Sequence, residues 1–448
     1  MPTAAAVSRR PCANGSEGET VTTTPSSPLG PTADTDTGSA PRGGFAARVS
    51  LGRVFAPVPS EFLLLASTAL ILTGFGLVMV LSATMATANA SPFDTFLKQA
   101  VFAAVAIPLM FVASRMPVRF WKRIAWPALI AGLLLQLLVF VPGLGVHNDG
   151  NTNWISIAGF QAQPSEFLKL SLALWLGFVL YRKRTLLTKW QHVFIPVVPV
   201  GALVIGTIMA GHDLGTAMIV MSILLGCLFF SGVKLRLFLL PLIGVVAAAA
   251  VFAVTSPNRM ARIMSFLNVD STDCYFADAG SCYQPLHGIW ALASGGIFGL
   301  GLGNSREKYQ WLPAAANDYI FAIVGEELGL IGCAVVLALF ALFAVGAFHV
   351  IRKTDDPFVR IVSGGITIWI VGQALVNIGV VLRVFPVLGV PLPFMSQGGT
   401  SLMSVLLACG VLLSFARTLP VRSPLAVAPV GGRVAPRVEP ARAGAVRR

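Results

Sequence analysis

The sequence has little charge for its length. Only 11% of its 448 residues are charged and 55% are hydrophobic, whereas an ordinary soluble domain has roughly 25% charged residues. A soluble chain of this length would form about two or three domains, but here long uncharged apolar runs set the architecture. The composition therefore excludes an ordinary soluble globular protein and indicates a membrane protein.

Short motifs of several enzyme classes are also missing. The sequence has no Walker loop, no HExxH, no GxSxG and no GxGxxG, so nothing in it indicates ATP-driven transport, zinc hydrolysis or serine hydrolysis. Its net charge of +13 does not indicate nucleic-acid binding, because the basic residues stand in short clusters between apolar runs rather than in a basic and aromatic stripe. We expect no nucleotide cofactor and no nucleic-acid partner.

Ten apolar runs approach the length needed to cross a membrane, about 20 residues. They lie near 62–82, 97–114, 124–142, 167–181, 193–210, 214–231, 235–255, 320–348, 359–381 and 399–416. Ten crossings with a cytoplasmic N-terminus place 25 of the 32 basic residues inside, whereas an eleventh crossing at the glycine-rich run 285–303 would leave 18 inside. The positive-inside rule therefore favours ten crossings. We predict an all-α, polytopic membrane domain over 59–418, with 285–303 as a re-entrant or interfacial segment.

The two ends of the chain differ from this apolar middle. Residues 1–58 are rich in Ser, Thr, Pro, Ala and Gly and lack the apolar segment of a signal peptide, which predicts a disordered cytoplasmic tail. Residues 419–448 form a second tail, in which several arginines accompany one acid, Glu439. This basic tail is expected to bind anionic membrane lipid.

A long outside loop, 256–319, contains two of the six cysteines. Cys274 and Cys282 stand eight positions apart in this loop, in a compartment where disulfides persist. They are candidate partners in a disulfide that staples the loop. Three other cysteines lie in apolar runs, where a free cysteine packs as a small side chain.

Charged residues open two of the predicted spans from the outside. In the segment from Gln161 to Lys169, Ser165 is a plausible N-cap, Glu166 lies at the positive end of the helix, and Lys169 follows one turn later. Asp213 has the same place before the next span. Capping is sufficient to explain these residues, and a functional role stands beside it as an alternative.

An amphipathic helix is predicted over 258–267, because its apolar residues recur on one face. Arg259 and Arg262 lie three positions apart on another face, on the side of the membrane that is usually poor in Arg. One explanation is anchoring to lipid headgroups. The other is binding of a phosphate or pyrophosphate, whose oxygens match the guanidinium group bidentately.

Three acids accompany the start of the eighth predicted span. Asp318 lies where the outside loop enters the span, either as a helix cap or as a carboxylate that meets a substrate at the water–lipid boundary. In a continuous helix, Glu326 and Glu327 would lie about 12 Å deeper, at about 1.5 Å per residue. Acids at such depth need a partner, a proton or a water-filled cavity. We expect at least one to face the bundle interior, with Lys98 or Lys169 as its counter-charge.

These residues carry a resemblance to a known family. The motifs are Asn304-Ser305 with Trp311-Leu312-Pro313, Asn317 to Gly329, Gln163 to Lys169, Asp213 to Thr216, and Pro391 to Ser401. Through these motifs, over about residues 60–417, the chain resembles the SEDS family (shape, elongation, division and sporulation). The Asn304-Ser305 pair and Gly325 to Gly329 are closer to the division branch than to the elongation branch.

The chain departs from the family pattern at four positions. Ala316 stands two residues before Asp318, where a His or similar polar residue is usual, and Asn153 replaces a common Arg before Trp154. Lys98 stands in for the Arg of an Arg-Gln pair, and Gln397 replaces a frequent Tyr. These changes affect fine substrate contacts and leave Asp318 in place.

The resemblance implies a peptidoglycan glycosyltransferase of the cytoplasmic membrane, acting at the division septum. Its substrate would be lipid II, a disaccharide-pentapeptide on undecaprenyl pyrophosphate, polymerised by inverting displacement with Asp318 as general base. Cations would stabilise the leaving pyrophosphate: Arg259, Arg262, Lys98 or a divalent metal, Mg²⁺ or Mn²⁺. The expected partners are a class B penicillin-binding protein that crosslinks the strand, and other divisome proteins. The expected substrate-binding residues are Lys98, Arg259, Arg262, Glu166, Lys169, Asp213, Ser396, Gly398 and Gly399.

Other functions remain as alternatives. A lipid II flippase would depend on Glu326 and Glu327 but tolerate loss of Asp318. A non-catalytic scaffold would tolerate loss of all three acids. An elongation polymerase would carry out the same chemistry during cell elongation.

Overall fold

The computed structural model describes residues 58–85, 92–148, 151–157, 160–234, 236–239, 241–244, 247, 257–267 and 282–420. The described helices belong to one unit, Pro57–Arg448. Almost all of both predicted tails, about half of the predicted span 235–255, and Cys274 lie outside the described residues.

Helices make up most of the described chain. The main ones are α1 (Ser60–Thr84), α2 (Pro92–Ala113), α3 (Val118–Leu137), α4 (Pro164–Arg182), α5 (Trp190–Ala210), α6 (Leu214–Phe230), α8 (Pro257–Leu267), α10 (Tyr283–Gly295), α11 (Ile320–Lys353), α12 (Pro357–Thr367), α13 (Gln373–Val381) and α14 (Gly399–Ala416). A π-helical turn, Ile368–Gly372, joins α12 to α13 in one continuous span. The predicted helical, polytopic membrane fold is confirmed.

Seven described helices are long and apolar enough to cross a membrane. They are α1, Phe93–Ala113 of α2, Val118–Phe140, α5, α11, Pro357–Val381 and α14. The apolar α6 is shorter, and α4 carries Glu166, Lys169 and Arg182. The total of ten crossings stays a prediction, because part of the seventh predicted span is not described.

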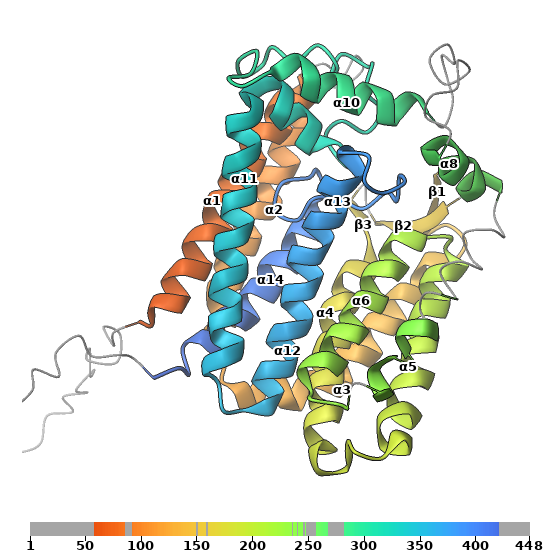
Figure 1. Ribbon diagram of the computed structural model, residues 1–448, viewed down its shortest axis with the longest axis vertical. Coiled ribbons are helices and arrows are strands. Elements are labelled where there is room, and N and C mark those ends of the chain that lie inside the picture. The colour runs from red at the N-terminus through yellow and green to blue at the C-terminus, as the bar shows by residue number, and fades with distance from the viewer. Residues whose placement is uncertain are drawn as a thin grey trace, which may run out of the picture. The chain divides into compact units, whose positions relative to one another are not determined.

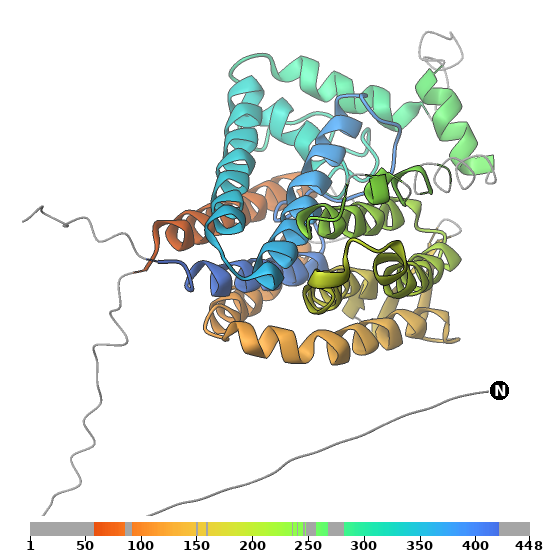
Figure 2. The ribbon, with the colours of Figure 1, turned by 60° about the horizontal axis from the view of Figure 1, so that its bottom comes forward.

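The helix α14 forms the centre of the bundle. It lies beside α1, α2 and α12 (Figures 1 and 2), and its Val405, Leu406 and Leu412 are fully buried. At Gly410 a Cβ atom would lie 2.7 Å from both the Met110 carbonyl oxygen and the Ala113 Cβ. Only glycine permits this close approach of α14 to α2, a form of packing typical of membrane helices.

A small sheet accompanies the helices, and the all-α prediction did not include it. The strands β1 (Gly145–Asn148), β2 (Asn151–Ile157) and β3 (Phe160–Ala162) form an antiparallel sheet in the order β1-β2-β3. Gly145 pairs with Ile155, and Ile155 with Ala162. The Thr152 amide also donates to the Gly211 carbonyl across 3.1 Å. Backbone pairing thus gives the polar loop before α4 a defined shape and ties it to the α5–α6 turn.

A break at Gly329 divides α11. Its φ of 68° and ψ of −163° are not helical, and a Cβ there would lie 2.4 Å from the Gly299 nitrogen and the Ile297 oxygen. The glycine-rich segment after α10 pairs with the break: the Leu300 amide donates to the Glu326 carbonyl and the Leu330 amide to the Gly296 carbonyl, both at 2.9 Å. Helix α10 lies across this end of the bundle (Figure 1). The run 285–303 is therefore not one continuous helix, and its predicted re-entrant or interfacial position stays a prediction.

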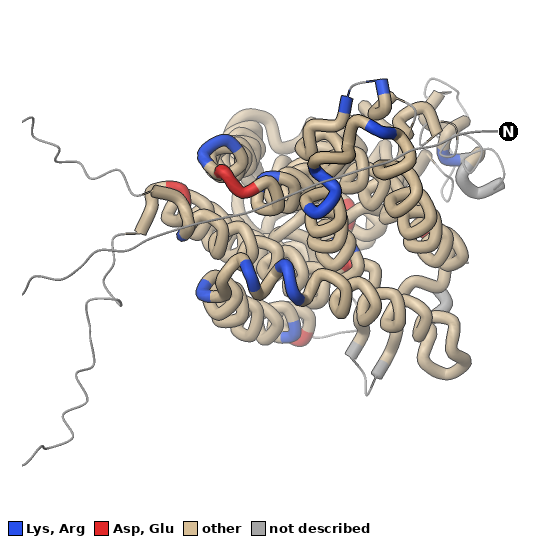
Figure 3. Tube along the Cα trace, turned by 90° about the horizontal axis from the view of Figure 1, so that it is seen from below, with Lys and Arg blue, Asp and Glu red and all other residues tan. Residues whose placement is uncertain are grey.

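Charge is distributed unequally between the two ends of the described unit. Figure 3 views the end that carries the turns after α2 and α4 and between α11 and α12, where Lys and Arg gather with few acids. Basic residues concentrate on the cytoplasmic side of membrane proteins. This end is therefore the one for which the cytoplasmic side is predicted, and that orientation stays a prediction. Asp318 lies at the opposite end.

Candidate active site

Asp318 is positioned through its backbone by α13. The Asn377 side-chain amide donates to the Asp318 carbonyl and to the Val390 carbonyl, each across 2.7 Å. The residue that caps α11 is Tyr319, and no side chain makes a cap hydrogen bond there. Helix capping therefore does not explain Asp318.

The segment from Pro391 to Ser401 holds the chain that precedes Asp318. The Ser396 hydroxyl donates to the Asn317 carbonyl across 2.5 Å and accepts from the Leu392 amide at 2.7 Å. The Gln397 amide donates to the Ala316 carbonyl at 2.9 Å. Ser396, predicted to bind substrate, thus makes bonds that fix the chain beside Asp318.

The two glycines after Ser396 also contact protein. The Gly398 amide donates to the Gln99 side-chain oxygen across 3.1 Å, and a Cβ on Gly399 would lie 2.1 Å from the Phe102 ring. Both predicted substrate residues therefore pack this segment against α2. Direct contact of Gly398 and Gly399 with substrate stays a prediction.

The Asp318 carboxylate itself is partly buried and accepts no hydrogen bond from any described residue. Its Oδ2 faces Gly389, where a Cβ would lie 3.7 Å away. The pKa of Asp318 is raised to about 6, first by burial and then by the negative charge of Asp213, against the lowering effect of the Arg262 guanidinium. At neutral pH the carboxylate is therefore ionised and able to accept a proton.

Asp213 is the second carboxylate of the site. As predicted, it caps α6: its Oδ1 accepts from the Thr216 amide at 2.8 Å. Its Oδ2 accepts from the Gln163 side-chain amide at 3.2 Å. Burial raises the pKa of Asp213, against its hydrogen bonds to Thr216 and the charge of Lys169. Asp213 thus both caps α6 and acts electrostatically on Asp318.

Glu166 and Lys169 neutralise one another inside the bundle. Their charged atoms lie 2.9 Å apart and both side chains are buried. Lys169 also donates to the Gln373 side-chain oxygen at 3.0 Å, and the Ser404 hydroxyl donates to Glu166 at 3.3 Å. Ser165 is not the predicted cap, because Pro164 begins α4 and Gln163 precedes it without a side-chain cap bond. The Lys169 ammonium group is therefore already bonded to Glu166 of α4 and Gln373 of α13.

The predicted counter-charges of Glu326 and Glu327 are wrong. Glu327 pairs with Lys308, whose Nζ lies 2.9 Å away, and accepts from the Ser82 hydroxyl at 2.6 and 2.7 Å. Glu326 accepts from the Ser305 hydroxyl and, at 2.8 Å, from the Arg306 amide. Lys98 is exposed. The loop before Asp318 folds back onto the broken α11 and supplies these partners, which the assumption of a continuous helix could not reveal.

Comparison with known proteins identifies the family of this chain. The family model that joins FtsW, RodA and SpoVE, described as cell cycle proteins, matches residues 62–420. This chain belongs to that family, the SEDS proteins.

Two relatives share much of their length with this SEDS protein. The probable peptidoglycan glycosyltransferase FtsW of Mycobacterium tuberculosis is 39% identical over 395 residues, 87% of this chain and 73% of the relative. Stage V sporulation protein E of Bacillus subtilis is 35% identical over 364 residues, 80% of this chain and 97% of the relative.

Solved structures show the same fold. A peptidoglycan synthase complex, described for its coordination of polymerization and crosslinking, has a TM-score of 0.64 at 24% identity and covers 79% of this chain and 96% of its own. RodA of Thermus thermophilus has a TM-score of 0.58 at 22% identity and covers 81% and 98%.

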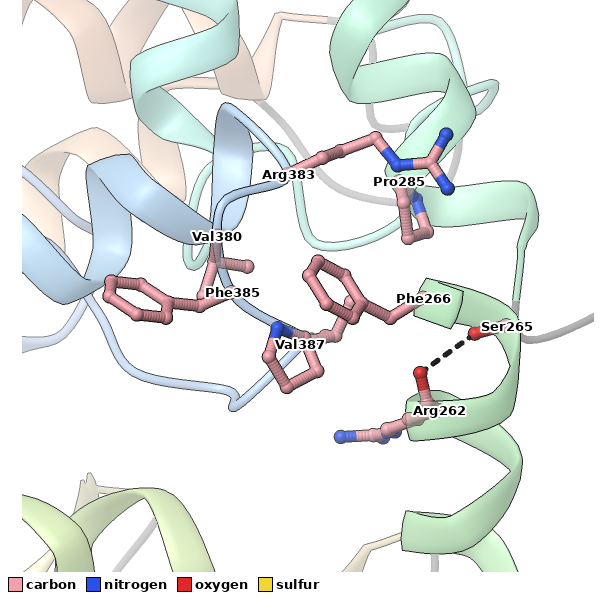
Figure 4. A pocket seen from close by; sticks show the side chains of 9 residues that line it. Arg262, Ser265, Phe266, Pro285, Val380, Arg383, Phe385 and Val387 are labelled. Atoms are coloured by element: carbon pink, nitrogen blue, oxygen red, sulfur yellow. Dashed lines mark hydrogen bonds between the residues drawn. The ribbon is translucent and has the colours of Figure 1, made fainter. Parts of the chain in front are cut away.

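Of the cations predicted to stabilise the leaving pyrophosphate, Lys98 and Arg262 have described side chains in this SEDS protein, and both are exposed. The predicted amphipathic helix is present as α8, but the Arg259 side chain is outside the described part. Arg262 is exposed and lines a pocket together with Arg383, which follows α13 (Figure 4). The predicted pairing of Arg259 with Arg262 stays untested, and Arg383 is an addition.

Sequence reasoning missed three residues of the site. Gln373 and Asn377 are buried and bond to Lys169 and to the Asp318 backbone. Two amides four positions apart in an apolar run could have marked them, because polar groups inside a membrane need partners. Arg383 follows an apolar run without any motif that marks it.

One of the two loop cysteines is described. Cys282 is buried and forms a disulfide. Its predicted partner, Cys274, lies outside the described residues, so their pairing stays a prediction.

Proposed function

We propose that this protein is a peptidoglycan glycosyltransferase that polymerises lipid II, with Asp318 as general base. One observation carries the proposal: a carboxylate with a pKa raised to about 6 lies free of hydrogen bonds from the described residues, on a segment that a family motif holds in place. The names of the relatives support the reaction class. A base is most effective when its pKa lies near the working pH.

The chemistry is a single inverting displacement. The acceptor hydroxyl loses its proton to an Asp318 oxygen while its own oxygen bonds to the anomeric carbon of the donor. The bond between that carbon and the diphosphate oxygen breaks, and the diphosphate leaves with the electron pair. No covalent enzyme intermediate is needed, because an α-linked donor gives a β-linked glycan in one inversion. Proton transfer of this kind contributes typically about 10²–10⁴-fold.

Asp213 is the residue that would hold a divalent cation, because Asp318 has to stay free to accept the proton. Among the described residues, no three His, Cys, Asp or Glu side chains gather as a metal site. Mg²⁺, however, commonly binds through one or two carboxylates together with substrate phosphates, and Asp213, whose charge raises the pKa of Asp318, would supply one carboxylate. When bound, Mg²⁺ or Mn²⁺ would neutralise the negative charge that develops on the leaving diphosphate.

The proposed setting is the division septum, with a class B penicillin-binding protein and other divisome proteins as partners. The structural likeness to a synthase complex that coordinates polymerization with crosslinking supports a crosslinking partner. The FtsW relatives support division rather than elongation. A flippase would need Glu326 and Glu327 as free acids, but both are saturated by protein bonds.

The test is glycan-strand formation from lipid II by the purified protein with its penicillin-binding partner, whose crosslinking is blocked. Wild-type protein should make polymer, and a folded, partner-binding Asp318→Asn protein should make almost none. Equal polymer from both would remove Asp318 as the base. No polymer from wild type in an otherwise active complex would overturn the polymerase assignment.

A further inference from the structure

Arg383 occupies a backbone position that favours glycine. Helix α13 ends in a Schellman arrangement: the Val384 amide donates to the Gly379 carbonyl at 2.7 Å, and the Arg383 amide to the Val380 carbonyl at 3.0 Å. Arg383 has a φ of 58°, the left-handed conformation that glycine usually adopts at this position. A backbone outlier of this kind supports a functional hypothesis for its side chain.

Arg262 lines the same pocket from α8. The pocket lies between α8, the first turn of α10 and the segment after α13. Figure 4 shows Arg383 and Arg262 on different sides of it, with the Phe266 ring between them in this view. Val380, Phe385 and Val387 complete an apolar wall. The pocket thus combines two guanidinium groups with a surface that suits hydrocarbon.

Neither arginine forms an ion pair with any described residue. Both act electrostatically on Tyr319, and Arg262 also acts on Asp318. Two unpaired guanidinium groups on the outer side of a membrane protein attract an anion, and their planar donors match phosphate oxygens bidentately. A diphosphate offers enough oxygens for both.

We propose that Arg262 and Arg383 form a subsite that binds the diphosphate of a lipid-linked substrate or product beside Asp318, with Phe266 and Phe385 against its first hydrocarbon units. The inference rests on the proposed function and makes it more specific. It also explains why an arginine occupies the glycine position after α13.

The test is equilibrium binding of undecaprenyl diphosphate to the detergent-solubilised full chain. Undecaprenyl monophosphate and phosphatidylglycerol serve as comparison lipids, and inorganic pyrophosphate as a competitor. The variants are Arg383→Gly, which suits the backbone, Arg383→Lys, which keeps the charge, and Arg262→Gln. Arg360→Gln is the matched control, because it removes an exposed positive charge at the cytoplasmic end.

We expect the diphosphate to bind more tightly than either comparison lipid, and inorganic pyrophosphate to compete with it. Arg383→Gly and Arg262→Gln should each weaken binding about 10- to 100-fold, the range of a lost charge-assisted contact. The affinity of Arg383→Lys should lie between those of wild type and Arg383→Gly, and the affinity of Arg360→Gln should equal that of wild type. The melting temperature of Arg383→Gly should not fall.

Three results would overturn the subsite. They are wild-type affinity in both arginine variants, equal binding of all three lipids, and failure of inorganic pyrophosphate to compete. The assay involves no turnover and is repeated in the Asp318→Asn background. Loss of the subsite is therefore distinguishable from failure of the polymerase proposal, which the lipid II assay tests separately.

Discussion

Glu326 and Glu327 in α11 differ from Asp318, just before α11, in burial and in hydrogen bonding. Glu326 and Glu327 are fully buried and accept bonds from Ser305, Lys308 and Ser82, whereas Asp318 is partly exposed and its oxygens accept none from the described residues. Paired buried charges hold a structure together, because breaking one pair leaves an uncompensated charge. An unpaired carboxylate with a raised pKa is available for chemistry. The difference separates supporting acids from the reacting acid.

The largest effect should follow Asp318→Asn. Loss of the base should reduce polymerisation of lipid II about 10²–10⁴-fold. Its stability at neutral pH should be unchanged or higher, because a site that raises the pKa of Asp318 disfavours the ionised form. Initial rates and unfolding in detergent measure the two effects. A large loss of stability would mean that Asp318, like Glu326 and Glu327, supports the fold.

Lys308→Met should have the opposite profile. It leaves Glu327 buried without its cation, which should lower the free energy of unfolding by about 3–5 kcal/mol. Unfolding by SDS titration measures this change. Adding Glu327→Gln should restore part of the stability. Arg306→Met, an exposed neighbour on the same loop, should change stability by less than about 0.5 kcal/mol; an equal loss there would refute the ion-pair explanation.

The pH dependence of the rate should report the protonation of Asp318, with a midpoint that the neighbouring charges shift. With a pKa of about 6, the rate should be constant near pH 7.5 and fall about tenfold per pH unit well below the midpoint, as the base becomes protonated. Asp213→Asn removes a like charge and should move the midpoint down. Arg262→Gln removes an opposite charge and should move it up. Rates measured from pH 5 to 8 provide the check, and identical midpoints in all three proteins would contradict it.

The smallest effect should be a gain in stability from Arg383→Gly. Glycine avoids the steric cost of a side chain at a φ of 58°, so the free energy of unfolding should rise by about 1 kcal/mol. The same denaturation series measures it. An unchanged or lower stability would mean that the Arg383 side chain contributes packing that offsets its backbone cost.

Several parts of the fold and site were predictable from local patterns. Apolar runs predicted most of the helices, and apolar residues that recur on one helix face predicted α8. The family motif marked Asp318. The cap at Asp213 followed from its place before an apolar run. The sheet β1–β3 was missed, because its strands are short and lie in a polar loop. The alternations Ile155-Ser156-Ile157 and Phe160-Gln161-Ala162 are too brief to indicate a strand by themselves.

Local patterns along the chain were enough to predict the membrane class, most of the apolar helices and the candidate base. These depend on hydropathy, charge and motifs, which neighbouring residues along the chain define. Tertiary contacts were needed to reveal that Lys308 neutralises Glu327, that Gly329 breaks α11, and that Arg383 and Arg262 line one pocket. The physical reason is that a buried charge takes the partner that the fold brings within hydrogen-bonding distance, and spacing along the chain does not specify that partner.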